Sequence, residues 1–201
     1  MATNPPIEFV SGQRGMGKTT YIRTRILNVE PRFLVYDHMA EFYTQGDGMV
    51  VYSAKDAISY IKQHPDGLMR LYFVPANPSE EEFRIVCRIP FAYPGLTVVV
   101  DELDNFATAA WPPEEFRKLI HFGRHAECGF VGASRRPADV SRAFTSQAQR
   151  FVIFRQTEPR DLVYLRSILG DRVLKVKELP PLHYLAFEGD RVLAGTVNPA
   201  Q

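Results

Sequence analysis

The 201-residue sequence has two cysteines, no long hydrophobic run and a net charge of only +1. Cys87 and Cys128 lack metal-ligand spacing, so we expect two reduced thiols in or near the core and no disulfide framework. No run approaches the roughly 20 apolar residues of a membrane-spanning helix, and the N-terminus lacks the apolar core of a signal peptide. These absences argue against a disulfide-stapled protein and against an integral membrane segment, and we expect a cytoplasmic location.

Two further kinds of site are missing from the sequence. The five histidines show no metal-ligand pattern. His121 and His125 lie four residues apart on a predicted helix, which would suit zinc, but no cysteine or third ligand lies nearby, and we interpret both as structural. A guanine-reading N/T-K-x-D sequence is also absent, which argues against a GTPase switch.

What is present indicates a layered globular fold. The composition, 45% hydrophobic and 23% charged, is ordinary for a soluble domain. The length suits one domain over residues 1–201, with a core at about 7–155 and a further helix and hairpin at 156–201. Strand-like and helix-like runs alternate along the chain, which predicts an α/β fold with parallel strands joined by crossover helices.

The predicted elements can be placed by residue range. Strands are expected at 7–10, 32–37, 49–52, 68–74, 97–100, 130–134 and 151–154. Helices are expected at 54–63, from Ser79 as N-cap onward, at about 112–123, and at 158–169 before Gly170. Residues 184–187 and 192–197 predict a C-terminal β-hairpin. On the last helix, Arg160 and Arg166 lie on a face suited to DNA or a protein partner.

The charges are distributed unevenly along the chain. Residues 1–116 contain 10 Lys and Arg against 15 Asp and Glu, residues 117–177 contain 13 against 5, and residues 178–201 contain one against three. The basic segment, which is rich in arginine, indicates an anionic partner met by one face. An equally open alternative is a solvated helical surface whose arginines pair with acids elsewhere in the fold.

A glycine-rich stretch organises the chain. Residues 12–19 fit the pattern G-x-x-x-x-G-K-S/T without a mismatch, between a strand-like run and a helical pattern. Glycines let the backbone N–H groups turn inward around a polyphosphate, while Lys18 reaches the β- and γ-phosphates and the Thr19 hydroxyl ligates Mg²⁺. A chance glycine-rich turn is disfavoured by this context. The sequence therefore predicts a site for ATP and Mg²⁺, with binding residues Gly12, Gln13, Arg14, Gly15, Met16, Gly17, Lys18, Thr19 and Thr20.

A second motif follows three consecutive valines. Val98, Val99 and Val100 predict a central parallel strand buried on both faces, and Asp101 and Glu102 come directly after it. Ligands bind at the carboxyl ends of strands in open α/β sheets. In a nucleotide enzyme Asp101 would hold the metal, while Glu102 would orient the attacking water or accept its proton.

Residues 123–141 make the pattern more specific. The segment GRHAECG leads into the apolar run 130–134, which ends in RRPADVS. Together with the earlier motifs, in the same order over residues 7 to about 155, this resembles the FtsK–HerA superfamily of ring-forming P-loop ATPases that pump DNA. The resemblance implies a three-layer P-loop NTPase fold of the ASCE or RecA-like kind, with a central, mainly parallel sheet.

The resemblance also implies roles for individual residues. Ser134 stands where the family has a polar sensor of the γ-phosphate, but the next residue, usually glutamine, is Arg135. Either Ser134 senses the phosphate alone or Arg135 acts electrostatically on it. Arg124 resembles the arginine finger offered to a neighbouring subunit, although a structural role at a helix end is the alternative. Arg135, Arg136 and Arg155 are rival candidates for the finger.

The chain is little more than an ATPase core, and in this it resembles the genome-packaging ATPases of membrane-containing icosahedral viruses. That resemblance implies an ATPase that translocates double-stranded DNA without sequence preference, self-associates into a ring and docks at a capsid vertex in the host cytoplasm. Zonula occludens toxin-like phage assembly ATPases are the alternative, but they normally carry a transmembrane segment. A small-molecule kinase is less favoured, because it needs no carboxylate pair after the central strand.

Overall fold

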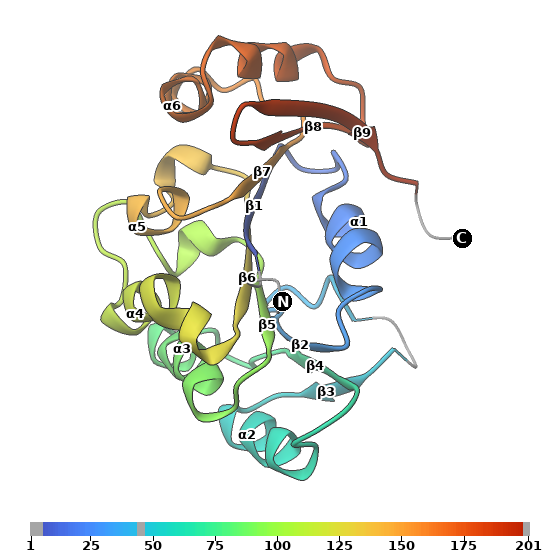
Figure 1. The fold of residues 1–201 in the computed structure, drawn as a ribbon, viewed down its shortest axis with the longest axis vertical. Helices are drawn as coiled ribbons and strands as arrows, with labels where there is room; N and C mark the ends of the chain where they lie inside the picture. The colour runs from blue at the N-terminus through green and yellow to red at the C-terminus, as the bar shows by residue number, and fades with distance from the viewer. Residues whose placement is uncertain (1–5, 44–46, 199–201) are drawn as a thin grey trace.

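A nine-stranded sheet organises the computed structural model, which describes residues 6–43 and 47–198 (Figure 1). The strands lie in the order β3-β4-β2-β5-β6-β1-β7-β8-β9. Their bounds are β1 (Ile7–Ser11), β2 (Arg32–Tyr36), β3 (Met49–Val51), β4 (Met69–Phe73), β5 (Thr97–Val100), β6 (Gly129–Ser134), β7 (Arg150–Ile153), β8 (His183–Glu188) and β9 (Arg191–Thr196).

The sheet is parallel except at one end. Every neighbouring pair from β3 to β7 is parallel, whereas β8 pairs antiparallel with both β7 and β9. Val152 of β7 lies opposite Ala186 of β8, so the C-terminal hairpin extends the main sheet. The predicted α/β fold, with a mainly parallel sheet and a C-terminal hairpin, is confirmed.

Helices cover both faces of this sheet (Figure 1). Helix α1 and the π-helical segment η1 lie on one face, and α3, α4 and α5 lie on the other. The helix bounds are α1 (Lys18–Tyr21), η1 (Ile22–Leu27), α2 (Ala54–Gln63), α3 (Glu80–Ala92), η2 (Leu103–Asn105), α4 (Glu114–Phe122), η3 (Gly123–Ala126), η4 (Pro137–Asp139), α5 (Arg142–Thr145), α6 (Pro159–Leu169) and η5 (Asp171–Glu178). Within the described residues no helix has both the length and the hydropathy needed to cross a bilayer.

The valine strand separates two hydrophobic clusters. Val98 and Val100 pack in the larger cluster, which includes side chains of α3 and α4, while Val99 packs in the smaller cluster with α1 and η1. Successive side chains of a strand point to opposite faces, so burial of all three valines requires a layer on each side. Cys87 and Cys128 belong to the larger cluster as buried free thiols, as expected.

Local signals account for several helix ends. The Ser79 hydroxyl accepts a hydrogen bond from the Glu82 N–H at the start of α3, as predicted, and Ser53 caps α2 in the same way. Gly170 follows the last residue of α6. The helix after the glycine-rich stretch differs from a regular α-helix: after one turn it widens into η1. The helical pattern expected after the glycine-rich stretch is confirmed, but its π-helical form was not expected, and neither was η5.

The parallel pairing brings the strand ends that matter to one edge of the sheet. Ser11 at the end of β1 lies beside Ser134 at the end of β6 and Ile153 at the end of β7. Val100, at the end of β5, lies opposite Gly132 of β6 on the other side. The glycine-rich stretch and the Asp101–Glu102 pair therefore leave the sheet at the same edge.

Candidate functional site

The glycine-rich stretch leaves β1 as a tight loop that only glycine allows at certain positions. Gly15 and Gly17 have φ angles of 75° and 114°, in the left-handed region that residues with a side chain avoid. Gly12 lies so close to Phe154, the residue that follows β7, that an added Cβ would be 2.5 Å from the Phe154 Cβ. The glycines of the motif thus meet a conformational need at Gly15 and Gly17 and a packing need at Gly12.

Hydrogen bonds fix this loop to its neighbours. The Gly12 N–H donates to the carbonyl oxygen of Ser134 (3.3 Å), and the Gln13 N–H donates to that of Arg155 (3.0 Å). The carbonyl oxygen of Met16 accepts from the N–H of Leu182, just before β8 (2.9 Å). The loop is therefore held at three points by the ends of β6, β7 and the C-terminal hairpin.

Lys18 is buried within the loop. Its ammonium group donates to the carbonyl oxygens of Gly12 (2.7 Å) and Gln13 (3.3 Å). Burial lowers its pKa to about 8, and the nearby carboxylate of Asp101 opposes this shift. A buried cation inside a ring of peptide groups is a strong attractor for a polyanion.

A cavity of about 280 Å³ opens above the loop. It brings together residues from both motifs and also some that the sequence did not single out. The predicted members of its lining are Arg14, Gly15, Gly17, Lys18, Thr19, Thr20, Asp101 and Arg135. Glu41 and Leu182 complete it. Glu41 follows β2 at the same sheet edge, a position the rule for strand ends could have flagged. No signal in the sequence indicates Leu182.

The Asp101 carboxylate is buried at the edge of this cavity. Burial raises its pKa to about 6, whereas the Glu102 N–H, which donates to Oδ1 at 2.9 Å, and the Lys18 ammonium act in the opposite direction. Thr19 and Asp101 present oxygen atoms to the same cavity. Mg²⁺ takes oxygen ligands and usually only one or two from the protein, so these residues fit it when a phosphate supplies the rest.

No group of three or more His, Cys, Asp or Glu side chains suited to a metal is found within residues 6–43 and 47–198. The two-oxygen set of Thr19 and Asp101 needs no such group.

Glu102 is held in one position by three side chains. Its Oε1 lies 2.6 Å from Nη2 of Arg135, and its Oε2 accepts a hydrogen bond from Asn105 (3.2 Å) and lies 3.5 Å from Nε2 of His38. The backbone of Glu102 is left-handed, with φ of 44°, an uncommon and costly conformation for a residue with a side chain. His38, like Glu41, follows β2 and was missed by the sequence reasoning.

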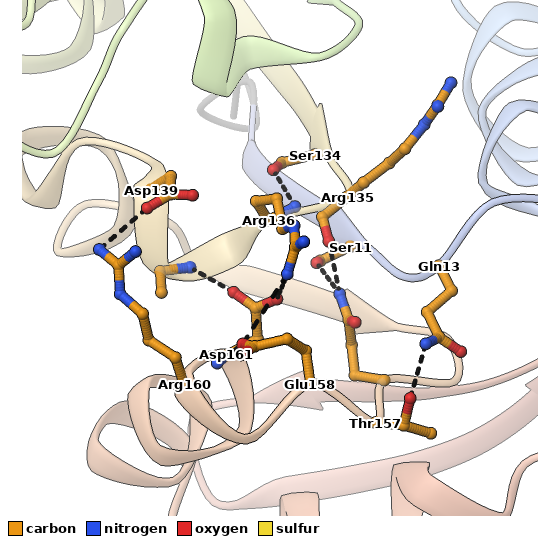
Figure 2. A network of polar contacts seen from close by, with 12 residues as sticks. Ser11, Gln13, Ser134, Arg135, Arg136, Asp139, Thr157, Glu158, Arg160 and Asp161 are labelled. Carbon is orange, nitrogen blue, oxygen red and sulfur yellow. Dashed lines mark hydrogen bonds and ion pairs between the residues drawn. The ribbon is translucent and has the colours of Figure 1, made fainter.

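Ser134 and Arg135, the two residues considered as a γ-phosphate sensor, have different surroundings. The buried Ser134 hydroxyl accepts the N–H of Arg136 (2.8 Å), and this side chain is not part of the cavity lining. Arg135 lines the cavity instead. Figure 2 shows the side chains of Arg135 and Arg136 pointing in different directions, the latter toward Glu158 and Asp161.

A polar network joins this edge to the start of α6 (Figure 2). The side-chain amide of Gln156 donates to the Ser11 hydroxyl (3.2 Å) and to the Arg135 carbonyl oxygen (3.1 Å). Gln13 donates through its side chain to the hydroxyl of Thr157 (2.7 Å). Gln156 was not singled out from the sequence, because only the fold brings β7 beside β1.

Arg124 lies far from this cavity. It belongs to η3, before β6, and lines a small cavity of about 110 Å³ near Ile7 and Gln149, at the beginnings of β1 and β7. Strands of five or six residues span roughly 17–20 Å, so Arg124 is separated from the loop by the length of the sheet. Any contact of this exposed side chain with a glycine-rich loop requires the loop of another subunit.

Some cations of the basic segment, residues 117–177, pair with acids of the fold, and others remain available for an anionic partner. Five of its 13 cations form ion pairs: Arg135, Arg136, Arg150, Arg160 and Arg166. Arg160 pairs with Asp139 at 3.0 Å and Arg166 with Asp171 at 2.6 Å, so both of the arginines expected to face a partner have acidic neighbours within the chain.

The sequence matches no protein-family model and no curated protein sequence. Solved structures do match. The genome packaging NTPase B204 from Sulfolobus turreted icosahedral virus 2, in complex with AMPPCP, has a TM-score of 0.77 and 18% identity, covering 98% of this chain and 100% of B204.

Two larger proteins share the same fold over part of their length. The pCW3 conjugation coupling protein TcpA, as a monomer with ATPgS, has a TM-score of 0.61 and 14% identity, covering 99% of this chain and 62% of TcpA. The cytoplasmic domain of the type VII secretion ATPase EccC from Thermomonospora curvata has a TM-score of 0.58 and 16% identity. The match covers 95% of this chain and 25% of the EccC chain. The expected P-loop ATPase fold, and the resemblance to viral packaging ATPases in that fold, are confirmed.

The buried charge of Asp101 generates a prediction about stability. A carboxyl whose pKa is higher in the folded protein binds its proton more tightly there, so stability falls as pH rises from about 4 to about 6. Asp101→Asn should raise the free energy of unfolding of the ligand-free protein by roughly 1–3 kcal/mol above pH 6. The gain should shrink toward pH 4.

Thermal unfolding of both proteins between pH 4 and pH 8 measures this difference. Asp66→Asn removes an exposed carboxylate and serves as the matched control, with no pH-dependent gain expected. A stability difference between Asp101→Asn and the wild type that is the same at pH 5 and pH 8 would contradict the assignment of a buried, strained charge at Asp101.

Proposed function

We propose that this protein is an ATP-hydrolysing motor that translocates double-stranded DNA, and that it packages a viral genome. The observation that carries the proposal is the meeting, at one sheet edge, of the loop with Lys18 and Thr19 and the pair Asp101 and Glu102. The fold supports genome packaging as the process, because this chain and the packaging NTPase B204 match over nearly their whole lengths. B204 has been solved with AMPPCP and with ATP-gammaS.

In this proposal the loop binds the phosphates of ATP. Inward-facing N–H groups of residues 12–20 would donate to the phosphate oxygens, and the Lys18 ammonium would exchange its two carbonyl acceptors for the β- and γ-phosphates. Thr19 and Asp101 would hold Mg²⁺. When bound, the ion supplies positive charge that offsets the charge developing on the phosphate oxygens.

Glu102 would serve as the general base. The attacking water forms a bond to the γ-phosphorus, the bond from that phosphorus to the bridging oxygen breaks, and the water's proton passes to the Glu102 carboxylate. The carbonyl oxygen of Ser134 accepts a hydrogen bond from the Gly12 N–H, so Ser134 would help to position the loop. Its predicted role as a sensor stays a prediction.

The partner we propose is duplex DNA bound without sequence preference. Eight cations of residues 117–177 have no ion pair within the described part of the chain and are available to phosphates. Arg117 and Lys118 are two of them, and they line an open cavity on the outer side of α4 beside the exposed Trp111. Ring assembly and docking at a capsid vertex in the host cytoplasm complete the proposal.

Lys18→Ala and Glu102→Gln should separate binding from turnover. Lys18 neutralises phosphate charge in the ground state, so Lys18→Ala should lose ATP binding and hydrolysis together. Glu102→Gln should retain ATP binding and lose about 10²–10⁴-fold in turnover, the usual contribution of a general base. Calorimetric binding and steady-state phosphate release measure the two effects. Normal hydrolysis by Glu102→Gln would show that the assignment of Glu102 is wrong.

Arg124 should act on the site of a neighbouring subunit. Arg124→Ala alone should bind ATP and hardly hydrolyse it, because arginine fingers contribute about 10³–10⁵ in rate. Mixing it with Glu102→Gln subunits should restore activity, since some interfaces then pair an intact Glu102 with an intact Arg124. Mixtures that co-assemble and remain inactive would mean that Arg124 holds structure only.

A further inference from the structure

The general base proposed above is not free in this structure. The Glu102 Oε1 is 2.6 Å from the Arg135 guanidinium, and both side chains are partly shielded from water, with 16% and 33% of their surface exposed. A charge-assisted bond of this length occupies one of the lone-pair sites of the carboxylate and turns Oε1 toward Arg135 instead of toward a water molecule. Opening of this ion pair would free Oε1 to accept a proton from the attacking water.

The same guanidinium can reach a second anion. Arg135 lines the loop cavity together with Lys18 and Thr19. It follows β6 directly, and Figure 2 shows its side chain extending away from the Arg136–Asp161 network, with only its backbone oxygen bonded there. Arg135 thus stands between the carboxylate of Glu102 and the space where the loop would place a γ-phosphate.

We propose that Arg135 is the residue by which this protein distinguishes a nucleoside triphosphate from a diphosphate. Without a γ-phosphate Arg135 stays paired with Glu102 and keeps the base from acting. A bound triphosphate draws the guanidinium onto its γ-phosphate, and Glu102 is released to the water. The inference rests on the proposed nucleotide site and adds to it a specificity residue at the position where the resembling family has an uncharged glutamine.

Other contacts keep Glu102 in place when Arg135 leaves. Asn105 donates a hydrogen bond to Oε2 at 3.2 Å. The left-handed backbone conformation of Glu102 sets the direction in which its side chain leaves the main chain. Nε2 of His38 lies 3.5 Å from Oε2. The His38 side chain is 7% exposed, and neither ring nitrogen has a hydrogen-bond partner within the described residues. The carboxylate would therefore remain next to Asp101, which lines the cavity, and it is 16% exposed to water.

A double-mutant cycle on nucleotide affinity tests the exchange. The four proteins are wild type, Glu102→Gln, Arg135→Gln and the double variant, and the ligands are AMPPCP and ADP. Glu102→Gln frees Arg135, so it should bind AMPPCP at least about 5-fold more tightly than wild type while its ADP affinity changes little. In the Arg135→Gln background the same substitution should give no gain.

Glu41→Gln is the matched control, because Glu41 lines the same cavity and, in the described part of the chain, its carboxylate forms no ion pair with Arg135. Removing its charge should change AMPPCP affinity equally in both backgrounds. Equal effects of Glu102→Gln in both backgrounds, or equal effects on AMPPCP and ADP, would overturn the exchange and leave the nucleotide site intact. Failure of the wild-type protein to bind AMPPCP would overturn the nucleotide site itself, and the exchange with it.

Discussion

The insertion of β1 between β6 and β7 is the constraint on which the rest of the site depends. Parallel pairing on both sides aligns the ends of three strands, and the loop that follows β1 is bonded to the ends of both neighbours. Glycine is required at position 12 because Phe154, which follows β7, is so close. From this alignment follow the position of Lys18, the arrival of Asp101 from β5 at the same edge, and the placement of Arg135 after β6.

The site holds charged side chains in buried positions, where their charged forms are less stable than in water. Burial shifts the pKa values of Lys18 and Asp101 toward their neutral forms, and Glu102 adopts an uncommon backbone conformation. Each feature costs the ligand-free protein stability. Such costs are typical of functional sites and persist where the surrounding fold is stable enough to carry them. A phosphate chain and its cation would offset much of this charge imbalance.

Much of the fold was predictable because its signals are local. The valine run, the Ser79 cap and the strand–helix alternation act within a few residues, and the glycine-rich loop carries its own spacing. The side-chain contacts within the site could not be predicted from the sequence. The pairing of Arg135 with Glu102, the nearness of His38 and the contribution of Leu182 depend on strands far apart in sequence. The ion pair of Arg160 likewise required η4 and α6 to be placed together.

In the proposed function, ATP hydrolysis at this edge of the sheet is coupled to the binding of DNA. The most direct measurement is the steady-state rate of ATP hydrolysis as duplex DNA is added, with two unrelated sequences and several salt concentrations. We expect both duplexes to raise the rate equally and the stimulation to decrease as salt rises, because arginines and lysines that contact phosphates release counterions. A rate that ignores DNA and rises instead with a small phosphate acceptor would contradict it.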